Sequence, residues 1–501
     1  MDALPFLQTS HLLLFLVGVI SALLVWKNRG RPTGFERLPP GPPPIPVLGN
    51  ILQIDIKQPY KTYMELSQRF GPVCTIWLGP KPVVILSGLQ TLRDALVTQG
   101  EEFSDRAAYP MSMKITRGYG ILASNGHRWR EIRRYAVTTL KNFGMGQRSI
   151  EQRVQEEARS LVKAFAEHEG AVFQPSEDLG KAVSNIICSI VFGQRFEYDD
   201  PDFLMLYSTV CTYFHVLCSP IGMLYNIFPG IMEYLPGKHR HMFAMLQKFR
   251  EYVRRQSDIR LKHLDANSTP RDYMEAFLIK VVQEKDAPNS EFHYNNLLGS
   301  VWSLFSAGTE TTSSSLRQML LLMIKYPQIQ ARVQEEIDEV IGQDRSPSME
   351  DRLKMPYTDA VIHEAQRNMD IAPISVPHKV AVNTEFKNYY IPKDTTVFPL
   401  LSSVLYDPRL WKNPNNFDPE NFLDEEGRFK KNDGFVAFGL GRRVCLGEGL
   451  ARTELFLFTC SLLQRFTFVG TRPAEEIDTN PTCSSFGRMP RTYQCYAKPR
   501  A

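Results

Sequence analysis

Phe438-Gly-Leu-Gly-Arg-Arg-Val-Cys445-Leu-Gly447 is the most informative stretch of this 501-residue chain. Gly441 and Gly447 permit a tight turn and a close approach of the backbone to a flat ligand. Cys445 lies just before an apolar helical pattern from Leu450 to Leu463, and the N–H groups at a helix start favour a thiolate. A lone cysteine is more often a small buried hydrophobic residue, but these surroundings predict a metal ligand.

The glycines of Gly439-Leu-Gly441 also suggest a loop that binds a dinucleotide. Val444 stands where the third glycine of that loop belongs, and no acidic residue follows at the required distance. The sequence therefore argues against a dinucleotide site here.

Ala307-Gly308-Thr309-Glu310-Thr311-Thr312 lies inside a long apolar helical pattern that starts near Leu297. Glycine and β-branched residues weaken a helix interior, and threonine hydroxyls compete for backbone carbonyls. We therefore expect a loosened turn and a groove instead of a regular core helix. An acid beside an alcohol, Glu310 and Thr311, suits a proton relay in such a groove.

Two further charged helical patterns have ordinary explanations when taken alone. Glu364 and Arg367 are three residues apart in the pattern from Thr358 to Asn368, which makes a solvated surface pair. Trp129 and Arg133 lie one turn apart on a basic helix, which is typical of a solvated face or a nucleic-acid contact. The net charge of +4 is small for the chain length and gives no electrostatic case for nucleic acid.

The eight cysteines include no CxxC pair, which argues against a disulfide framework and a structural zinc site. From Leu12 to Trp26 the chain is almost continuously apolar, followed by Lys27, Arg29 and Arg31. A cleaved signal peptide is the alternative to a membrane anchor, but no basic residue precedes the run and no usual cleavage site follows it. The positive-inside rule then places the body in the cytosol and leaves the sequon at Asn267 without a glycan.

The predicted organisation is an anchor at residues 1–27, a basic and proline-rich hinge at 28–50 and one large domain at 51–501. Helical patterns dominate the middle of the chain, and short strand-like runs are fewer. The helices expected there span residues 150–166, 242–264, 297–324 and 329–341, with a hairpin at 73–86 and short strands at 379–397. Residues 218–236 are apolar and punctuated by Pro and Gly, which fits ordinary core or a second membrane contact.

The residues around Cys445 match the signature FxxGxRxCxG of cytochromes P-450 at every fixed position, so the chain resembles that family. The likeness extends to about Tyr496. Asn142-Phe-Gly-Met-Gly-Gln-Arg-Ser149 and Met355-Pro-Tyr-Thr-Asp-Ala360 are similar to the vertebrate microsomal family 2 enzymes. The implied fold is mainly α with a small β region, the cytochrome P-450 fold, preceded by a single N-terminal transmembrane anchor.

The resemblance also implies roles for individual residues. Cys445 corresponds to the thiolate ligand of haem b, and Glu310 and Thr311 to the oxygen-activating pair. Glu364 and Arg367 correspond to a buried pair bonded to a meander that resembles Phe417-Asp-Pro-Glu-Asn-Phe422, in which Asn421 replaces the usual basic residue. The implied contacts to the haem propionates are Arg106, Trp129, Arg133, His378 and Arg443. The implied substrate-pocket residues are Leu122, Ala123, Ala307, Thr311, Ala372, Val376 and Phe486.

The reaction implied is insertion of one atom of dioxygen into a lipophilic substrate by hydroxylation or epoxidation, with foreign compounds, fatty acids and steroids as equal candidates. No flavin or nicotinamide motif is visible, so electrons from NADPH must come through a separate reductase, with cytochrome b5 as a second donor and Arg130 and Arg134 as candidate docking contacts. The location implied is the endoplasmic reticulum membrane. A haem sensor or carrier would not need Glu310 and Thr311, and the same pair disfavours a haem-thiolate isomerase that needs no reductase.

Overall fold

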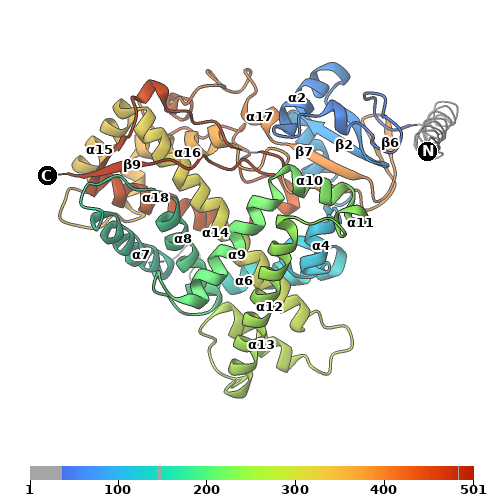
Figure 1. The fold of residues 1–501 in the computed structure, drawn as a ribbon, viewed down its shortest axis with the longest axis horizontal. Helices are drawn as coiled ribbons and strands as arrows, with labels where there is room; N and C mark the ends of the chain where they lie inside the picture. The colour runs from blue at the N-terminus through green and yellow to red at the C-terminus, as the bar shows by residue number, and fades with distance from the viewer. Residues whose placement is uncertain (1–36, 144–147, 483, 501) are drawn as a thin grey trace, which may run out of the picture.

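The computed structural model describes residues 37–143, 148–482 and 484–500. The predicted anchor at residues 1–27 and the first part of the hinge lie outside the described residues. Helices make up most of the described chain, with a small β region at one end (Figure 1). The mainly helical fold with a small β region is therefore confirmed.

The first half of the described chain contributes a series of helices, several of them short. They are α2 (Pro59–Phe70), α3 (Leu89–Arg93), α4 (Pro110–Thr116), α5 (Gly120–Ala123), α6 (Gly126–Asn142), α7 (Arg148–Ala166), α8 (Ser176–Val191), α9 (Pro201–Leu217), α10 (Pro220–Ile227), α11 (Pro229–Met232) and α12 (Lys238–Lys262). The second half contributes α13 (Tyr273–Gln283), α14 (Tyr294–Lys325), α15 (Pro327–Val340), α16 (Pro356–Met369), α17 (Ser402–Leu405) and α18 (Glu448–Arg465).

The strands form a five-stranded sheet in the order β1-β2-β7-β4-β3 and two two-stranded sheets, β5-β6 and β8-β9. Their bounds are β1 (Val73–Leu78), β2 (Lys81–Ser87), β3 (Asp105–Arg106), β4 (His378–Lys379), β5 (Thr384–Phe386), β6 (Tyr389–Ile391), β7 (Thr396–Leu400), β8 (Phe466–Gly470) and β9 (Cys495–Pro499). β1 and β2 form the predicted hairpin, with Val73 opposite Leu86. β2 also pairs in parallel with β7, which brings segments about 300 residues apart together.

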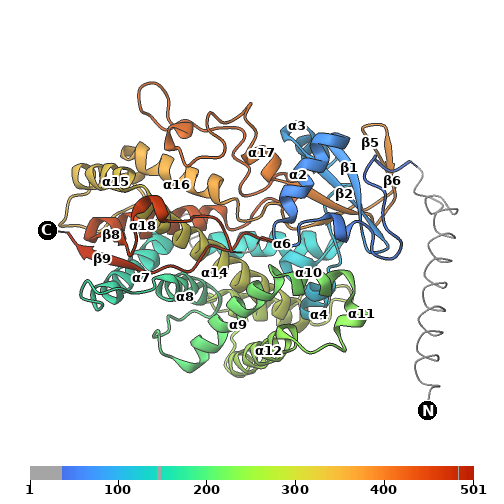
Figure 2. The same cartoon turned by 45° about the horizontal axis from the view of Figure 1, so that its top comes forward.

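The long helix α14 is the centre of the molecule. It packs against α8 and α9 on one side and against α16 and α18 on the other (Figure 2). Most of its residues are buried, including polar ones such as Ser303, Ser306 and Thr309. Gly308 lies against Ile187 of α8 so closely that a Cβ would be 2.5 Å from the Ile187 side chain. Glycine at this position therefore permits close helix packing.

The expectation of a loosened turn in this helix was wrong. α14 is a regular α-helix through residues 307–312. Thr311 Oγ1 donates to Ala307 O at 2.7 Å, so its hydroxyl bonds to a helix carbonyl while the helix stays intact. Packing on both sides outweighs the weak local propensity.

The apolar stretch at 218–236 is divided between core and surface. Tyr225 and Met232 are buried, whereas Ile231, Tyr234 and Leu235 are exposed. Within the described part of the chain, no single helix is long and apolar enough to cross a membrane. The pair α9 and α10, bent by 73° at their junction, meets the length and composition of a span together.

Candidate functional site

Cys445 lies in a turn whose backbone is fixed by close packing. Gly441 has φ +71°, and a Cβ there would be 1.9 Å from the carbonyl oxygen of Leu96. The Cys445 N–H donates to Phe438 O at 2.9 Å and closes the turn. Gly447 has an ordinary φ of −91°, and the nearest atom to a Cβ there would be Cys445 Sγ at 3.9 Å. Gly441 is therefore required by the turn, whereas Gly447 leaves space beside the sulfur.

The thiol of Cys445 is accessible although it lies deep in the protein. Its residue is exposed, yet burial raises the pKa of the thiol. Hydrogen bonds from the N–H groups of Gly447 and Glu448, and the nearby Arg133, oppose that rise in pKa without cancelling it. The N–H groups at the helix start therefore act in the expected direction, although burial has the larger effect on the pKa of the thiol. The residue can be accessible and yet surrounded by protein if its sulfur faces a space inside the molecule.

One face of α14 is also accessible. Ala307 is exposed and Thr311 is half-buried on a helix whose neighbouring residues are buried. Residues four apart share a helix face, so these two side chains point the same way. α18, which begins three residues after Cys445, packs against α14. We infer that the two accessible surfaces border the same interior space.

Glu310, the other half of the predicted relay, points to a different environment. Its carboxylate Oε1 forms an ion pair with Arg317 Nη2 at 2.6 Å and accepts a hydrogen bond from Ser314 Oγ at 2.9 Å. Both partners of this ion pair are buried or nearly so. The hydroxyl of Thr311, the next residue, donates instead to the backbone carbonyl of Ala307 in its own helix. The structure therefore places the acid and the alcohol on different faces of α14.

Buried cationic side chains gather on the other side of the Cys445 turn. Arg443 donates to Ser104 O and Ser124 O, both at 2.8 Å, and its guanidinium lies 3.8 Å from the ring centroid of Trp129. Arg133 Nη2 donates to Val444 O at 2.6 Å. Arg106 donates to Val376 O and pairs in register with His378, its neighbour across β3 and β4. The structure thus brings together all five residues predicted to hold the propionates.

The positive charges of this cluster have no carboxylate ion-pair partners among the described residues. Burial, and then repulsion by Arg106, lowers the pKa of Arg443 to about 8, and burial lowers that of Arg106 to about 9. Burial also lowers the pKa of His378 well below its usual value. In the described chain, no carboxylate forms an ion pair with Arg106, Arg133 or Arg443. Buried donors without partners remain at Arg106 Nε, Trp129 Nε1 and Arg443 Nη1.

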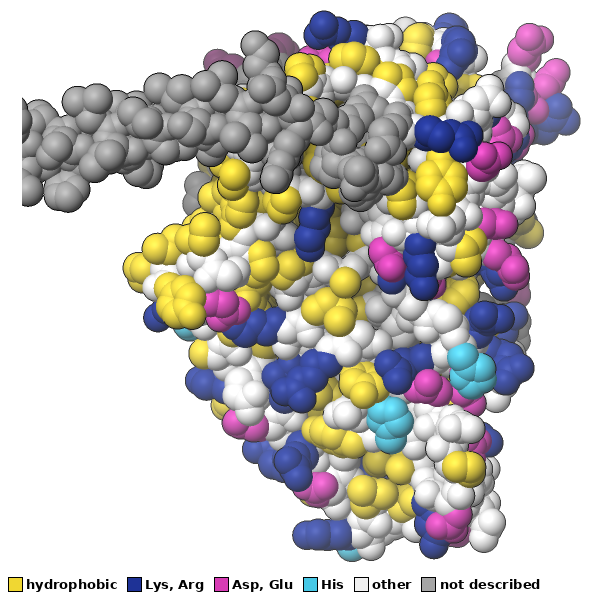
Figure 3. All heavy atoms as spheres, turned by 90° about the vertical axis from the view of Figure 1, so that its right-hand side faces the viewer, with side chains coloured by type: hydrophobic (Ala, Val, Ile, Leu, Met, Phe, Trp, Pro, Cys, Tyr) yellow, Lys and Arg dark blue, Asp and Glu magenta, His cyan; other side chains and the backbone are white. Residues whose placement is uncertain are grey.

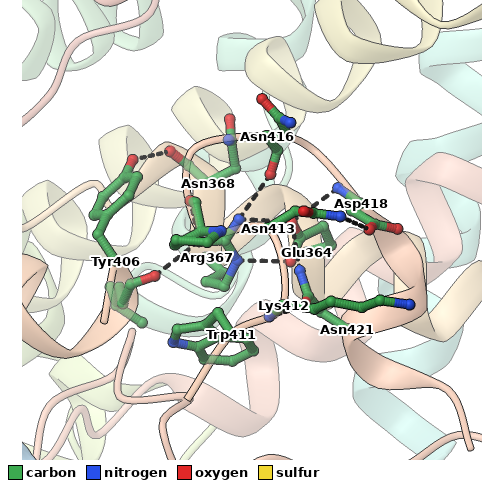
Figure 4. Close-up of polar contacts among 12 residues, drawn as sticks. Glu364, Arg367, Asn368, Tyr406, Trp411, Lys412, Asn413, Asn416, Asp418 and Asn421 are labelled. Carbon is green, nitrogen blue, oxygen red and sulfur yellow. Dashed lines mark hydrogen bonds and ion pairs between the residues drawn. The ribbon is translucent and has the colours of Figure 1, made fainter. Parts of the chain in front are cut away.

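Glu364 and Arg367 form the centre of a buried network below this site (Figure 4). Both side chains are 0% exposed and are joined by two hydrogen bonds of 2.7 Å. The remaining Arg367 donors reach three backbone carbonyls, those of Leu405, Pro414 and Asn416. All five guanidinium donors are therefore used, and the pair is not the solvated surface pair that the spacing alone suggested.

Asn421 takes part in this network. Glu364 Oε1 accepts from the Asp418 N–H at 3.0 Å and from Asn421 Nδ2 at 3.4 Å. Asn421 Oδ1 also accepts from the Lys412 N–H at 3.1 Å. The amide thus replaces a basic side chain with weaker, neutral hydrogen bonds.

The predicted substrate residues lie on several elements. Leu122 and Ala123 are in α5, and Ala372, Val376 and Phe486 are in loops; all five are half-buried. Phe486 also lines a small cavity of about 100 Å³ between α2, α10 and the sheet. Of the residues that line that cavity, only Phe486 was predicted from the sequence; the others include Tyr63, Tyr109, Leu217, Met223 and Ile374. They come from separate segments, and no local pattern marks them.

The site fits a flat ligand that carries an iron atom and two carboxylates. The accessible Cys445 sulfur supplies one metal ligand, and the unpartnered donors of the cationic cluster suit the carboxylates. The glycine-lined turn leaves room beside the sulfur. These features define a haem-thiolate protein.

Comparison with known proteins identifies the family. Residues 39–496 match the family described as Cytochrome P450. The chain is 60% identical to Cytochrome P450 2M1 of Oncorhynchus mykiss, over 100% of this chain and 99% of that protein. It is 48% identical to Cytochrome P450 2C8 of Homo sapiens (92% and 94%) and 47% identical to Cytochrome P450 2B4 of Oryctolagus cuniculus (96% and 98%). The chain therefore belongs to the cytochrome P450 family and is a haem-thiolate monooxygenase.

Proposed function

We propose that the Cys445 sulfur would bind the haem iron and that Arg106, Trp129, Arg133, Arg443 and His378 would hold the propionates. The observation that carries this proposal is the buried cationic cluster, which has donors without partners. When bound, the haem supplies the iron centre that receives electrons and activates dioxygen. Arg106 Nε, Trp129 Nε1 and Arg443 Nη1 would donate to the propionates, whose negative charge would offset that of the two arginines.

His378 contributes through its protonation state. Its Nδ1 lies 2.6 Å from Phe103 O, so that nitrogen carries a proton and donates a hydrogen bond to the carbonyl. Nε2 can then donate to a propionate only when the ring is an imidazolium. A nearby carboxylate favours that form and opposes the effect of burial on the pKa.

Thr311 Oγ1 is the group that delivers protons on the substrate side. It is half-buried beside the accessible Ala307 and donates to the Ala307 carbonyl at rest. Rotation of the hydroxyl would direct its proton into the interior space. Glu310 can reach this hydroxyl only after its ion pair with Arg317 opens, because that pair holds the carboxylate away from Thr311.

The substrate is lipophilic and lies against the small side chains of Ala123, Ala307 and Ala372, with Leu122, Val376 and Phe486 around them. A largely apolar wall with few polar groups suits hydrocarbon surfaces. Foreign compounds, fatty acids and steroids remain equal candidates, and a panel of such substrates would separate them.

A flavoprotein reductase supplies the electrons from NADPH, with cytochrome b5 as a second donor. Arg130 and Arg134 are exposed on α6, the helix that also carries Trp129 and Arg133. An acidic surface on the partner would dock there, close to the thiolate side of the site.

The body associates with the membrane of the endoplasmic reticulum through the N-terminal apolar run and a neighbouring surface. Val47 is 69% exposed, and Ile231 and Tyr234 on or just after α11 are 63% and 84% exposed. The two segments lie close together, because Phe228 and Val47 are both near the Cβ position of Gly79. Figure 3 shows hydrophobic side chains on this face of the molecule, with Lys and Arg side chains among and below them.

The test of the haem assignment is the substitution Cys445→Ser. The red-shifted absorption band of the reduced carbon monoxide adduct requires a thiolate ligand, so we expect the band to disappear. Cys460→Ser is the matched control, because Cys460 is completely buried in α18 and should leave the band unchanged. Loss of the band in Cys460→Ser with retention in Cys445→Ser would contradict the assignment.

A further inference from the structure

A second cavity lies outside the site described above. It has a volume of about 260 Å³, is partly open to solvent and is bordered by the end of α4, the middle of α12 and the first turns of α14. None of the residues predicted for the haem or the substrate lines it. Its volume is just below the range of about 300 to 1,000 Å³ that is usual for drug-sized ligands, so an occupant would be small.

The floor of this cavity is apolar. Leu246 and Phe249 of α12 and Trp302 of α14 form it and are nearly completely buried. The rings of Phe249 and Trp302 contact each other edge to face at 5.2 Å. The half-buried Leu298 completes the floor. Such a surface suits an aromatic ring or a short aliphatic chain.

The rim carries three arginines. Arg117 and Arg254 are exposed, and Arg250 is half-buried. Arg250 Nη2 donates to Lys114 O at 2.9 Å and also to Ile115 O, which fixes its position. Burial and the proximity of Arg117 lower the pKa of Arg250. The guanidinium groups of Arg117 and Arg250 thus lie close enough to repel each other.

The three arginines outnumber the one acidic residue in the lining of the cavity. None of the three arginines forms an ion pair with a described carboxylate. The one acidic residue in the lining, Glu251, accepts a hydrogen bond from Gln247 at 3.0 Å. Two neighbouring basic residues do have acidic partners: Lys114 pairs with Glu233 and Arg255 with Asp202.

The start of α14 adds to the positive potential. Tyr294 and Asn295, the first residues of this 32-residue helix, line the cavity. His293, the N-cap, makes no side-chain capping bond, so the first N–H groups and the helix dipole favour a nearby anion.

A tight contact separates the cavity from the predicted substrate residues of α5. A Cβ on Gly120 would be 2.2 Å from the backbone of Gly299, and the Gly120 N–H donates to Asn296 Oδ1 at 3.1 Å. Gly299 lines the cavity, whereas Leu122 and Ala123 follow Gly120 in the chain. The contact between Gly120 and Gly299 would therefore separate an occupant of the cavity from the substrate residues of α5.

We propose that this cavity binds a small amphiphilic anion, with a carboxylate, sulfonate or sulfate at Arg117, Arg250 and Arg254 and an apolar body on the floor. Charge-assisted hydrogen bonds to guanidinium groups fix the head. Burial of the tail against Leu246, Phe249 and Trp302 supplies the rest of the affinity. The site is separate from the reaction and does not depend on the haem assignment.

The test uses the full-length haem-loaded protein in discs of neutral phosphatidylcholine. 4-Butylbenzoate is titrated by calorimetry while 4-phenylimidazole saturates the haem pocket, and empty discs provide the background. We expect one saturable site for the benzoate and at least tenfold weaker binding of 4-butylbenzamide, which lacks the charge. Binding should weaken as salt is raised.

Variants locate the site. Arg117→Gln and Arg254→Gln should each weaken benzoate binding about tenfold, which is the usual effect of one hydrogen bond to a charged group. Arg255→Gln removes the same charge from the adjacent residue, which pairs with Asp202 outside the cavity, and should leave the affinity unchanged. The proposal is overturned if no binding exceeds that of empty discs, if the amide binds equally well, or if Arg254→Gln and Arg255→Gln have equal effects.

Discussion

Glu310 and Thr311 show at the scale of single residues what the sequence could and could not predict. The motif indicated which residue types meet there, but not the direction of the Glu310 carboxylate. Glu310, Ser314 and Arg317 stand at positions i, i+4 and i+7 of one helix, a spacing that places them on one face. This spacing in the sequence could have indicated the ion pair between Glu310 and Arg317.

The cationic cluster is the opposite case. Arg106, Trp129, Arg133, His378 and Arg443 lie far apart in the chain, and no periodicity connects them. Only the resemblance to a family suggested that they meet. The pKa values of Arg106 and Arg443 then follow from burial without an anion, which the sequence alone does not reveal.

Thr311→Ala should uncouple electron consumption from product formation. The substitution removes the accessible hydroxyl but leaves the apolar wall, so the haem spectrum and the substrate-induced spectral shift should stay nearly intact. Product formed per NADPH consumed should fall several-fold while hydrogen peroxide rises, because proton delivery is impaired. The measurement compares NADPH, product and peroxide in a reconstituted system with a substrate whose reacting group is a hydrocarbon.

Thr309→Ala is the matched control. Thr309 is completely buried, and its hydroxyl accepts a hydrogen bond from Ser184 of α8 at 3.3 Å. It lies two residues from Thr311 on another face, so its loss should cost stability without changing the ratio of product to NADPH. Normal coupling in Thr311→Ala, or equal uncoupling in both variants, would remove Thr311 from the relay.

At the scale of helices and strands, periodicity was a good guide. The helical patterns predicted α7, α12, α14 and α15 within a few residues of their observed bounds, and the Gly79-Pro80 break marked the hairpin of β1 and β2. The parallel pairing of β2 with β7 could not be predicted, because it joins segments about 300 residues apart. The regularity of α14 also depends on tertiary packing, since local propensity argued for a weak turn.

The contact between α16 and the meander after α17 yields a paired prediction. Glu364→Ala leaves the buried Arg367 without its carboxylate, and breaking a buried ion pair costs about 3 to 5 kcal/mol. We expect most of that variant to be recovered without haem. Asn421→Ala removes only one long, neutral bond to Glu364, so its cost should be about 1 kcal/mol or less.

The measurement for both variants is haem bound per milligram of protein, with the thermal midpoint of the haem absorbance. Should Asn421→Ala lose haem as completely as Glu364→Ala, the amide would be an essential member of the network. Equal recovery of haem in both variants would instead show that the pair is dispensable.

The contact between α14 and α18 yields a pH-dependent prediction. Glu454 of α18 is almost completely buried, one of its oxygens has no partner, and burial raises its pKa to about 8 although a bond from Thr312 opposes this. Between about pH 4.5 and 8 the carboxyl is protonated in the folded chain and ionised in the unfolded chain. The folded chain therefore binds more protons, and stability falls as pH rises through this window.

Glu454→Gln is neutral at every pH and keeps an acceptor for Thr312. Its stability relative to the native chain should be unchanged near pH 4.5 and should increase up to about pH 8, by a few kcal/mol at most, since one pH unit corresponds to about 1.4 kcal/mol. Thermal midpoints at pH 5 and pH 8 measure this gain. Glu475→Gln, which removes an exposed carboxylate, should give no such trend, and a pH-independent gain in Glu454→Gln would contradict the assignment.

At the scale of the whole molecule, the β sheet and the start of the described chain lie at one end, and β9 lies at the other (Figure 1). The exposed apolar residues near Val47 and on and after α11 are close to the start of the described chain. A membrane that holds the N-terminal apolar run would therefore also meet this surface. The arrangement limits the orientations that the body can adopt on the membrane.

The sequence also predicts how the whole chain is oriented relative to the membrane. The apolar run at 12–26 followed by Lys27, Arg29 and Arg31 predicts an anchor with the body on the cytosolic side. Protease added to intact microsomes should therefore degrade the body, and Asn267 should carry no glycan. Deleting residues up to Trp26 should weaken attachment without loss of haem, because no residue of the site precedes Arg106.

The contributions of the N-terminal run and of the exposed apolar surface to membrane binding can be distinguished by a second change. If the surface after α11 also binds the membrane, the truncated chain should still associate with vesicles, and replacing Ile231 and Tyr234 with Ser in that chain should release it. Both side chains are exposed, so the core should not be disturbed. The measurement is the fraction of haem protein that sediments with vesicles, with Val382→Ser, another exposed apolar residue, as the control. A protected body in intact microsomes, or a glycan on Asn267, would reverse the predicted topology, because both require the body to face the lumen.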